Sequence, residues 1–217
     1  MIVTIDGPAG VGKSTAARSL AQRLGFRFLD TGAMFRALAL FAQQQGVSWE
    51  DDQALGQLLP QFRLEMLPEG QIVLNGQVVT EALRTPEMSQ GASRVALLPV
   101  VRQHLADLQR QLARDGRIVC EGRDQGTVVF PQALCKFFLT ADIEVRVERR
   151  ARELEQRGQA VDREQLRREL SDRDQRDATR AVGALQQAED AILIDSSSLS
   201  REQVLEQMEA EVRRRLA

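Results

Sequence analysis

Five short apolar runs, separated by stretches with helical periodicity, are the feature that most restricts the fold of this chain. The runs cover residues 2–6, 26–29, 117–121, 136–140 and 191–195. Each is continuous rather than alternating, which is typical of parallel strands covered on both faces. Strands that alternate with helices predict an α/β fold, here a five-stranded parallel sheet with helices on both faces.

The stretches between the runs carry apolar residues at helical spacing. A break at Pro99 divides residues 86–114 into two helices. Gly25 is a plausible C-cap, and Ser200 with Gln203 forms a capping-box pattern. We expect the remaining helices over residues 13–24, 33–45, 143–156, 163–173 and 200–216.

Two segments depart from this pattern. Residues 63–80 alternate in polarity around the turns Pro68-Glu69-Gly70 and Asn75-Gly76, and an Asn-Gly turn between such runs is a strong hairpin signal. We expect a small antiparallel β insert at about residues 62–84; the alternative is an edge hairpin of the main sheet. Residues 142–180 hold eleven arginines and eleven acidic residues, which favours two solvated helices. Their end, 171–180, has few apolar anchors and should be mobile without a ligand.

Composition limits the classes of protein to consider. A length of 217 residues suggests one domain, residues 1–217. A net charge of −2, 4% aromatic residues and no tyrosine argue against nucleic acid as a partner. No run reaches the roughly 18–20 apolar residues of a membrane span, and no leader pattern is present, so we expect a cytoplasmic protein. Cys120 and Cys135 lie in apolar runs and are expected to be buried thiols.

A glycine-rich loop, residues 7–14, follows the first strand and opens the first helix. It fits the pattern G-x-x-x-x-G-K-[ST] at every fixed position. In such a loop the backbone N–H groups and the helix N-terminus bind phosphates, the lysine reaches the β- and γ-phosphates, and the hydroxyl of Ser14 holds Mg²⁺. The residues expected to bind the triphosphate are Gly7, Pro8, Ala9, Gly10, Val11, Gly12, Lys13, Ser14 and Thr15.

Three uses of a bound triphosphate are open. A GTPase switch would carry Asn-Lys-x-Asp, but Lys136, the only lysine besides Lys13, is flanked by Cys135 and Phe137. A mechanical or regulatory ATPase would need an acidic residue after an apolar strand, a place that Glu121 or Asp195 could take.

The third use, a small-molecule kinase, is favoured by the placement of arginines. Arg36 and Arg123 follow the second and third strands, and Arg180 lies in the charged segment. Because ligands bind beyond the carboxyl ends of parallel strands, these guanidiniums predict a site for an acceptor phosphate. A phosphate monoester is already largely ionised at neutral pH, so its transfer needs positioning and charge neutralisation rather than a base. The one histidine, His104, is interpreted as a core or surface residue of a helix.

Several motifs together resemble those of bacterial cytidylate kinases, the CMP/dCMP kinase family of the nucleoside monophosphate kinases. The most specific is residues 121–131, which read Glu-Gly-Arg-Asp-Gln-Gly-Thr-Val-Val-Phe-Pro. The others are residues 5–8 with 13–14, 30–32 with Arg36, 84–87 and 173–182. The resemblance covers essentially the whole chain. It implies that the insert belongs to the monophosphate-binding part and that residues 157–182 are a mobile helical lid.

The resemblance also implies an activity: direct in-line transfer of the γ-phosphate of ATP to CMP or dCMP, with Mg²⁺. We expect a monomer that acts on small-molecule nucleotides. Lys13, Arg123 and Arg180 would stabilise charge on the transferred group. The alternatives are a kinase for UMP or AMP, or a nucleotide-dependent ATPase or binding protein. The implied contacts to the acceptor are Ser93, Arg102 and Asp124 on cytosine, Arg173 and Asp177 on ribose, and Thr31, Arg36, Arg123 and Arg180 on phosphate.

Three positions differ from the family pattern. Thr31 stands where serine is frequent and keeps the hydroxyl, whereas Phe35 stands where tyrosine is common and lacks it. Ala178 occupies a lid position that is arginine in some members. Of the last two changes, the first removes a phenol hydrogen bond to the monophosphate side, and the second removes a positive charge from the lid.

Overall fold

A computed structural model describes residues 1–67, 70–114, 116–156 and 158–216. The chain divides into two compact units, the first comprising Met1–Phe28 with Gly116–Ala217 and the second Leu29–Asp115. None of the described helices is both long and apolar enough to span a bilayer.

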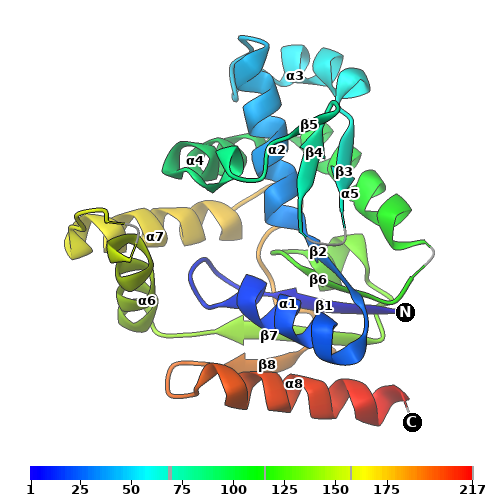
Figure 1. The fold of residues 1–217 in the computed structure, drawn as a ribbon, viewed down its shortest axis with the longest axis vertical. Helices are drawn as coiled ribbons and strands as arrows, with labels where there is room; N and C mark the ends of the chain where they lie inside the picture. Colours follow the sequence, from blue (N-terminus) through cyan, green and yellow to red (C-terminus); the bar gives the residue numbers. More distant parts are fainter. Residues whose placement is uncertain (68–69, 115, 157, 217) are drawn as a thin grey trace. The chain divides into compact units, whose positions relative to one another are not determined.

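The main sheet has five strands in the order β2-β6-β1-β7-β8 (Figure 1). Central strand β1 pairs in parallel with both β6 and β7, and β7 pairs in parallel with β8. This confirms the predicted parallel sheet, and each strand lies within one residue of its expected bounds. Those bounds are β1 Ile2–Asp6, β2 Arg27–Asp30, β6 Ile118–Glu121, β7 Cys135–Thr140 and β8 Ile192–Asp195.

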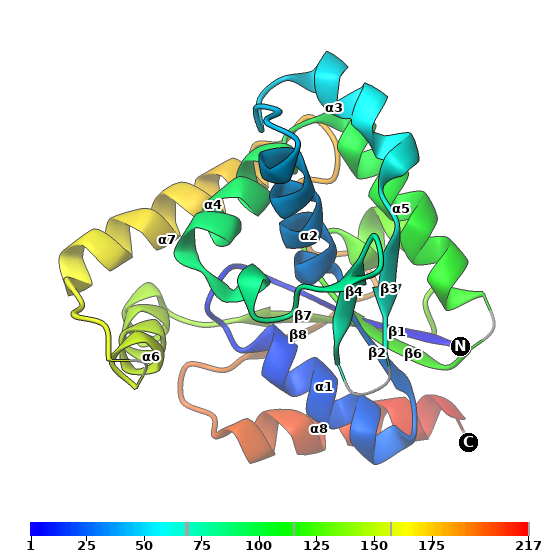
Figure 2. The same ribbon diagram turned by 45° about the horizontal axis from the view of Figure 1, so that its top comes forward.

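In the first unit, helices α1 (Lys13–Leu24) and α8 (Arg201–Leu216) pack together over one face of the sheet (Figure 2). Gly25 ends α1 with a left-handed φ of 65°, a conformation that glycine adopts without a steric cost. Ser200 and Gln203 exchange hydrogen bonds at the start of α8, as predicted: the N–H of Ser200 donates to Gln203 Oε1 at 2.9 Å, and the N–H of Gln203 donates to Ser200 Oγ at 3.2 Å. Both predicted thiols, Cys120 and Cys135, are buried and unbridged.

The charged segment forms α6 (Ile143–Glu155) and α7 (Arg163–Ala178), which pack against each other. Leu166 and Leu170 of α7 join a small apolar cluster that includes Ala9. The prediction that α7 ends at Arg173 is wrong, because the helix continues to Ala178. Asp177 in its last turn is buried in ion pairs with two arginines, and this attraction stabilises the additional turn. The expected mobility of residues 171–180 stays a prediction.

The second unit holds helices α2, α3, α4 and α5 and its own antiparallel sheet, in the order β3-β4-β5 (Figure 2). This separate sheet confirms an insert rather than an edge hairpin of the main sheet. Asn75 and Gly76 make the predicted turn with φ values of 46° and 82°, whereas Pro68 and Glu69 of the other turn lie outside the described residues. The bounds are β3 Leu64–Met66, β4 Ile72–Leu74, β5 Gln77–Val78, α2 Thr31–Gln44, α3 Asp52–Leu58, α4 Pro86–Val95 and α5 Pro99–Ala113.

Two helix starts in this unit follow from capping rather than from apolar spacing. Asp30 accepts a hydrogen bond from the N–H of Ala33 at 2.7 Å, so α2 begins at Thr31 and not at Ala33. Asp51 accepts one from the N–H of Ala54 at 2.9 Å and caps α3. The sequence analysis missed α3 because a helix of seven residues shows little periodicity. Single 3₁₀ turns span Leu59–Gln61 and Ala82–Arg84.

Candidate active site

The glycine-rich loop joins the end of β1 to the start of α1 in the first unit. Gly7, Gly10 and Gly12 have φ values of 146°, 79° and 95°, which residues with a side chain rarely adopt. A Cβ on Gly7 would lie only 2.0 Å from the carbonyl oxygen of Leu139 on β7. The backbone of the loop at Gly7 therefore lies too close to β7 for any residue with a side chain. The loop leads directly into the N-terminus of α1.

Lys13 is folded back onto this loop. Its Nζ donates a hydrogen bond to the carbonyl oxygen of Pro8 at 2.6 Å, and the residue is 5% exposed. Burial, assisted by the positive charge of Arg123, lowers the pKa of Lys13 to about 7. The ammonium group is thus held inside the loop, at the place where the predicted triphosphate would bring compensating negative charge.

Ser14 contacts an acidic residue that the sequence analysis did not include among its site residues. The Ser14 hydroxyl donates to Glu121 Oε1 at 2.8 Å, and Glu121 is the buried last residue of β6. The sequence analysis named Glu121 only as a candidate acidic residue of an ATPase, from its position after an apolar strand. Asp195, the other acidic candidate, is exposed and accepts hydrogen bonds from Ser197. A hydroxyl and a carboxylate together are the oxygen donors that suit Mg²⁺.

A tight turn after β6 carries Arg123 and Asp124. Asp124 is 5% exposed, and a single π-helical turn, Gln125–Val129, follows it. The carboxylate of Asp6, at the end of β1, accepts hydrogen bonds from the N–H groups of Gln125 at 2.9 Å and Gly126 at 2.7 Å. Burial is the main reason why the pKa of Asp6 rises to about 6. The turn is therefore fastened to the central strand of the sheet.

Arg123, Asp177 and Arg180, all predicted site residues, meet in the first unit. Arg123 Nε donates to Asp177 Oδ2 at 2.6 Å, and Arg180 Nη2 pairs with Asp177 Oδ1. Burial opposes the charge of Asp177, which is 1% exposed, but the arginines outweigh burial and lower its pKa. Two guanidiniums from distant segments therefore lie around one anionic group.

A second carboxylate of α7 contacts the glycine-rich loop itself. Asp174 Oδ1 accepts a hydrogen bond from the N–H of Ala9 at 3.2 Å, and its Oδ2 pairs with Arg146 of α6. Arg146 also donates to the carbonyl oxygen of Ala9 at 3.1 Å. The sequence analysis missed both residues, because nothing distinguishes them from the other charges of residues 142–180.

Of the remaining predicted acceptor residues, Arg173 lies on α7 in the first unit and the others lie in the second unit. Thr31 is buried at the start of α2, and Arg36 pairs with Asp30 at 3.3 Å. Ser93 is buried in α4, and Arg102 of α5 donates to the carbonyl oxygen of Ala96 at 3.3 Å. The prediction that Arg36 and Arg123 converge stays a prediction.

Phe35, which stands where the family often has tyrosine, lies against one of the predicted cytosine contacts. The Arg102 guanidinium carbon is 5.7 Å from the centroid of the Phe35 ring. At that distance the face of the ring can stabilise the cation. Phe35 thus has a role in supporting Arg102 that does not need a phenol hydroxyl.

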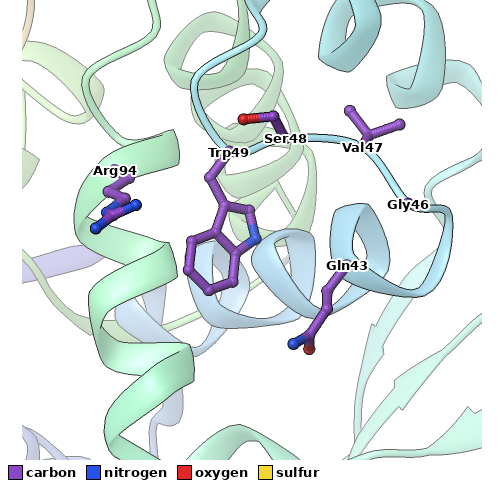
Figure 3. Close-up of a pocket in the computed structure, with 6 residues that line it drawn as sticks. All are labelled: Gln43, Gly46, Val47, Ser48, Trp49 and Arg94. Atoms are coloured by element: carbon purple, nitrogen blue, oxygen red, sulfur yellow. The ribbon is translucent and has the colours of Figure 1, made fainter.

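A hollow of about 390 Å³ in the second unit contains none of the predicted site residues. Figure 3 shows the indole of Trp49 between Arg94 on α4 and Gln43 on α2; the other lining residues are Gly46, Val47 and Ser48. Trp49 Nε1 donates to the carbonyl oxygen of Ala39 at 2.9 Å, and a Cβ on Gly91 would lie 2.8 Å from the indole ring. The indole therefore has a packing role between α2 and α4.

Solved structures show which fold this chain shares. A shikimate kinase from Bacteroides thetaiotaomicron superposes with a TM-score of 0.50 at 12% identity, covering 98% of both chains. A gluconokinase from Sinorhizobium meliloti gives a TM-score of 0.50 at 15% identity, covering 98% of this chain and 91% of its own. At these identities the likeness concerns the fold alone.

Sequence relatives define the family. The family model for cytidylate kinase matches residues 3–214. The cytidylate kinase of Carboxydothermus hydrogenoformans is 47% identical over 208 residues, covering 94% of both chains. That of Solibacter usitatus is 47% identical over 218 residues, covering 100% of this chain and 94% of its own. Taken with the glycine-rich loop and the paired arginines, these matches confirm the resemblance: the chain belongs to the cytidylate kinase family.

Proposed function

We propose that this chain transfers the γ-phosphate of ATP to CMP or dCMP, giving ADP and CDP or dCDP by direct in-line transfer. The observation that carries the proposal is the match to cytidylate kinases over residues 3–214, which includes the glycine-rich loop. We propose further that it works as a monomer in the cytoplasm, with nucleotides as its only partners. The balanced charge of −2 supports a preference for small molecules over nucleic acid.

The donor nucleotide is assigned to the glycine-rich loop. Its N–H groups and the N-terminus of α1 would bind the phosphates, and Lys13 would place a positive charge on the transferred group. Ser14 and Glu121, whose oxygen atoms lie 2.8 Å apart, are the residues that fit Mg²⁺. When bound, the ion would neutralise charge on the phosphate oxygens.

The acceptor phosphate is assigned to arginines. Arg123 and Arg180 already gather around Asp177, and phosphate offers guanidiniums the same planar oxygen pairs as a carboxylate does. With Arg36 and Thr31 they would hold the CMP phosphate in line with ATP, while Arg173 and Asp177 would bind its ribose. No general base is needed because the second pKa of a phosphate monoester is near 6. His104 lies edge-on to Phe62, with ring centroids 6.3 Å apart, and has no role in this scheme.

Cytosine recognition is assigned to Asp124, Ser93 and Arg102. The Asp124 carboxylate would accept from the exocyclic amine, and the other two would donate to ring acceptors. Uracil presents a carbonyl where cytosine has the amine, so the Asp124 carboxylate would face an acceptor oxygen instead of a donor. This complementarity supports CMP over UMP as the acceptor.

The proposal is tested by measuring ADP release in a coupled assay with CMP, dCMP, UMP and AMP as acceptors. We expect the largest kcat/KM with CMP or dCMP. A larger value with UMP or AMP would assign the chain to another monophosphate, and ADP release independent of any acceptor would indicate an ATPase.

Asp124→Ala should lower the ratio of kcat/KM for CMP to that for UMP by about 10-fold to 100-fold, the value of one hydrogen bond to a charged group. The KM for ATP should change little. Asp107→Ala, which removes an exposed carboxylate of α5, is the matched control. A CMP-to-UMP ratio that Asp124→Ala leaves unchanged would contradict the cytosine role.

Closure of the lid is tested by hydrogen exchange. Residues 171–182 should exchange more slowly when CMP and a non-hydrolysable ATP analogue are both bound, because ribose and phosphate would then hold α7 in addition to its own ion pairs. Peptides from α8 serve as an internal control and should keep their rates. Equal protection of residues 171–182 with and without nucleotides would argue against a lid there.

A further inference from the structure

Asp6 is a buried charged residue that the proposed mechanism does not use. It is 4% exposed and lies at the end of β1, the central strand of the sheet. Each of its carboxylate oxygens accepts one backbone hydrogen bond, Oδ1 from Gln125 at 2.9 Å and Oδ2 from Gly126 at 2.7 Å. A buried carboxylate is costly unless such partners satisfy it, so the position of these two N–H groups is closely linked to that of Asp6.

The two N–H groups directly follow Asp124 in the chain and begin the π-helical turn Gln125–Val129. The same turn is seated tightly on the sheet: a Cβ on Gly126 would lie 3.0 Å from Thr4 Oγ1 and 3.2 Å from Lys136 Cδ. Thr4 and Lys136 restrict how closely the turn can approach, and Asp6 supplies the attraction that holds it there. The backbone carrying Arg123 and Asp124 thus has a defined position on β1.

We infer that Asp6 is a positioning residue, which places Asp124 through the N–H groups of Gln125 and Gly126 and thereby sets the discrimination between cytosine and uracil. The inference rests on the cytosine role proposed above for Asp124. A displacement of about 1 Å at a recognition group is enough to weaken its hydrogen bonds to a bound base.

Asparagine is the informative substitution at this position. It has nearly the same shape as aspartate, but it offers one acceptor oxygen and an NH₂ group. Since both backbone partners are donors, the NH₂ would face an N–H, so that one hydrogen bond is lost and a repulsive contact replaces it. The turn should shift while the sheet beneath it keeps its packing.

The experiment measures kcat and KM for CMP, UMP and ATP in Asp6→Asn, Asp124→Ala and the double variant. Asp6→Asn should lower the CMP-to-UMP ratio of kcat/KM by about 10-fold, with the KM for ATP changed less than about 2-fold. In the Asp124→Ala background, Asp6→Asn should produce almost no further change in the ratio. Both variants act on the same contact, that between Asp124 and cytosine. If Asp6 had a purely structural role, Asp6→Asn would lower kcat/KM equally for CMP and UMP and leave their ratio constant.

Thr4→Val is the matched control. It lies two residues earlier on β1, also beneath the turn, and its Oγ1 has no hydrogen-bond partner among the described residues. The substitution keeps the volume but leaves both Asp6 hydrogen bonds in place, so the CMP-to-UMP ratio should stay constant. A fall as large as that of Asp6→Asn would mean that the ratio falls even when both Asp6 hydrogen bonds keep the turn in place, and would overturn the inference.

The outcomes separate the inference from the proposed function. If Asp124→Ala lowers the ratio but Asp6→Asn does not, the inference is overturned and the function stands. If Asp124→Ala leaves the ratio unchanged, its cytosine role fails, and the inference fails with it. Should Asp6→Asn not fold, Gly126→Ala displaces the same turn, because its Cβ would lie 3.0 Å from Thr4 Oγ1 and 3.4 Å from Asp6 Oδ2. It should lower the same ratio, and an unchanged ratio in that variant would also overturn the inference.

Discussion

Lys13→Ala should lower kcat by about 10³-fold to 10⁵-fold, the range for removing one positive charge from a phosphoryl-transfer site. Lys13 is buried inside the glycine-rich loop, where its Nζ lies 2.6 Å from the carbonyl oxygen of Pro8. Alanine leaves the space but no cation, so charge that develops on the transferred group loses its partner inside the loop. The loss corresponds to about 4–7 kcal/mol of transition-state stabilisation.

The measurement is steady-state ADP release with saturating ATP and CMP. Arg18→Ala is the control, since Arg18 is an exposed cation one turn further along α1 that stacks on Phe28 at 4.7 Å. It should keep nearly full turnover. Near-normal turnover in Lys13→Ala would be incompatible with the glycine-rich loop as the donor site.

Gly7→Ala should have the largest effect on stability. Its Cβ would lie 2.0 Å from the carbonyl oxygen of Leu139, in a backbone conformation with φ of 146°. Neither atom can move without displacing β7 or the loop, so we expect a loss of more than about 3 kcal/mol in the free energy of unfolding. Because small domains are stable by only about 5–15 kcal/mol, the midpoint of urea unfolding should fall clearly.

Gly25→Ala separates the two contributions to that effect. Gly25 also has a positive φ, 65°, but no atom lies within 4 Å of where its Cβ would be. Gly25→Ala should lower the free energy of unfolding by only roughly 1–2 kcal/mol, the cost of a left-handed backbone at a residue with a side chain. If Gly7→Ala were no more destabilised than Gly25→Ala, the close contact with β7 would not be present in solution.

Local chemistry explains what could be predicted from the sequence. Continuous apolar runs marked the buried strands, and Gly25, Pro99 and Ser200 marked helix ends because each acts on its own neighbouring backbone. The glycine-rich loop was found for the same reason, since its residues are consecutive. The short helix α3 was the exception: its cap at Asp51 is local, but seven residues are too few to show a period.

Contacts between distant residues could not be predicted in this way. Ser14 meets Glu121 across 107 positions, and Ala9 meets Asp174 across 165. No local pattern encodes such distances, and Asp174 is one of eleven acidic residues in its segment. The same limit explains why α7 was expected to end too early, because its last turn is held by ion pairs with Arg123 and Arg180 rather than by apolar spacing.

The carboxylates of α7 affect the free energy of nucleotide binding. With Asp177 between Arg123 and Arg180, and Asp174 on the N–H of Ala9, a phosphate that binds at the proposed sites would exchange with an anion already in place. The free energy of binding is then a difference between two similar attractions, both of which salt screens. Affinity for nucleotides should therefore depend less on ionic strength than the number of arginines suggests, and small free anions should compete poorly for these sites.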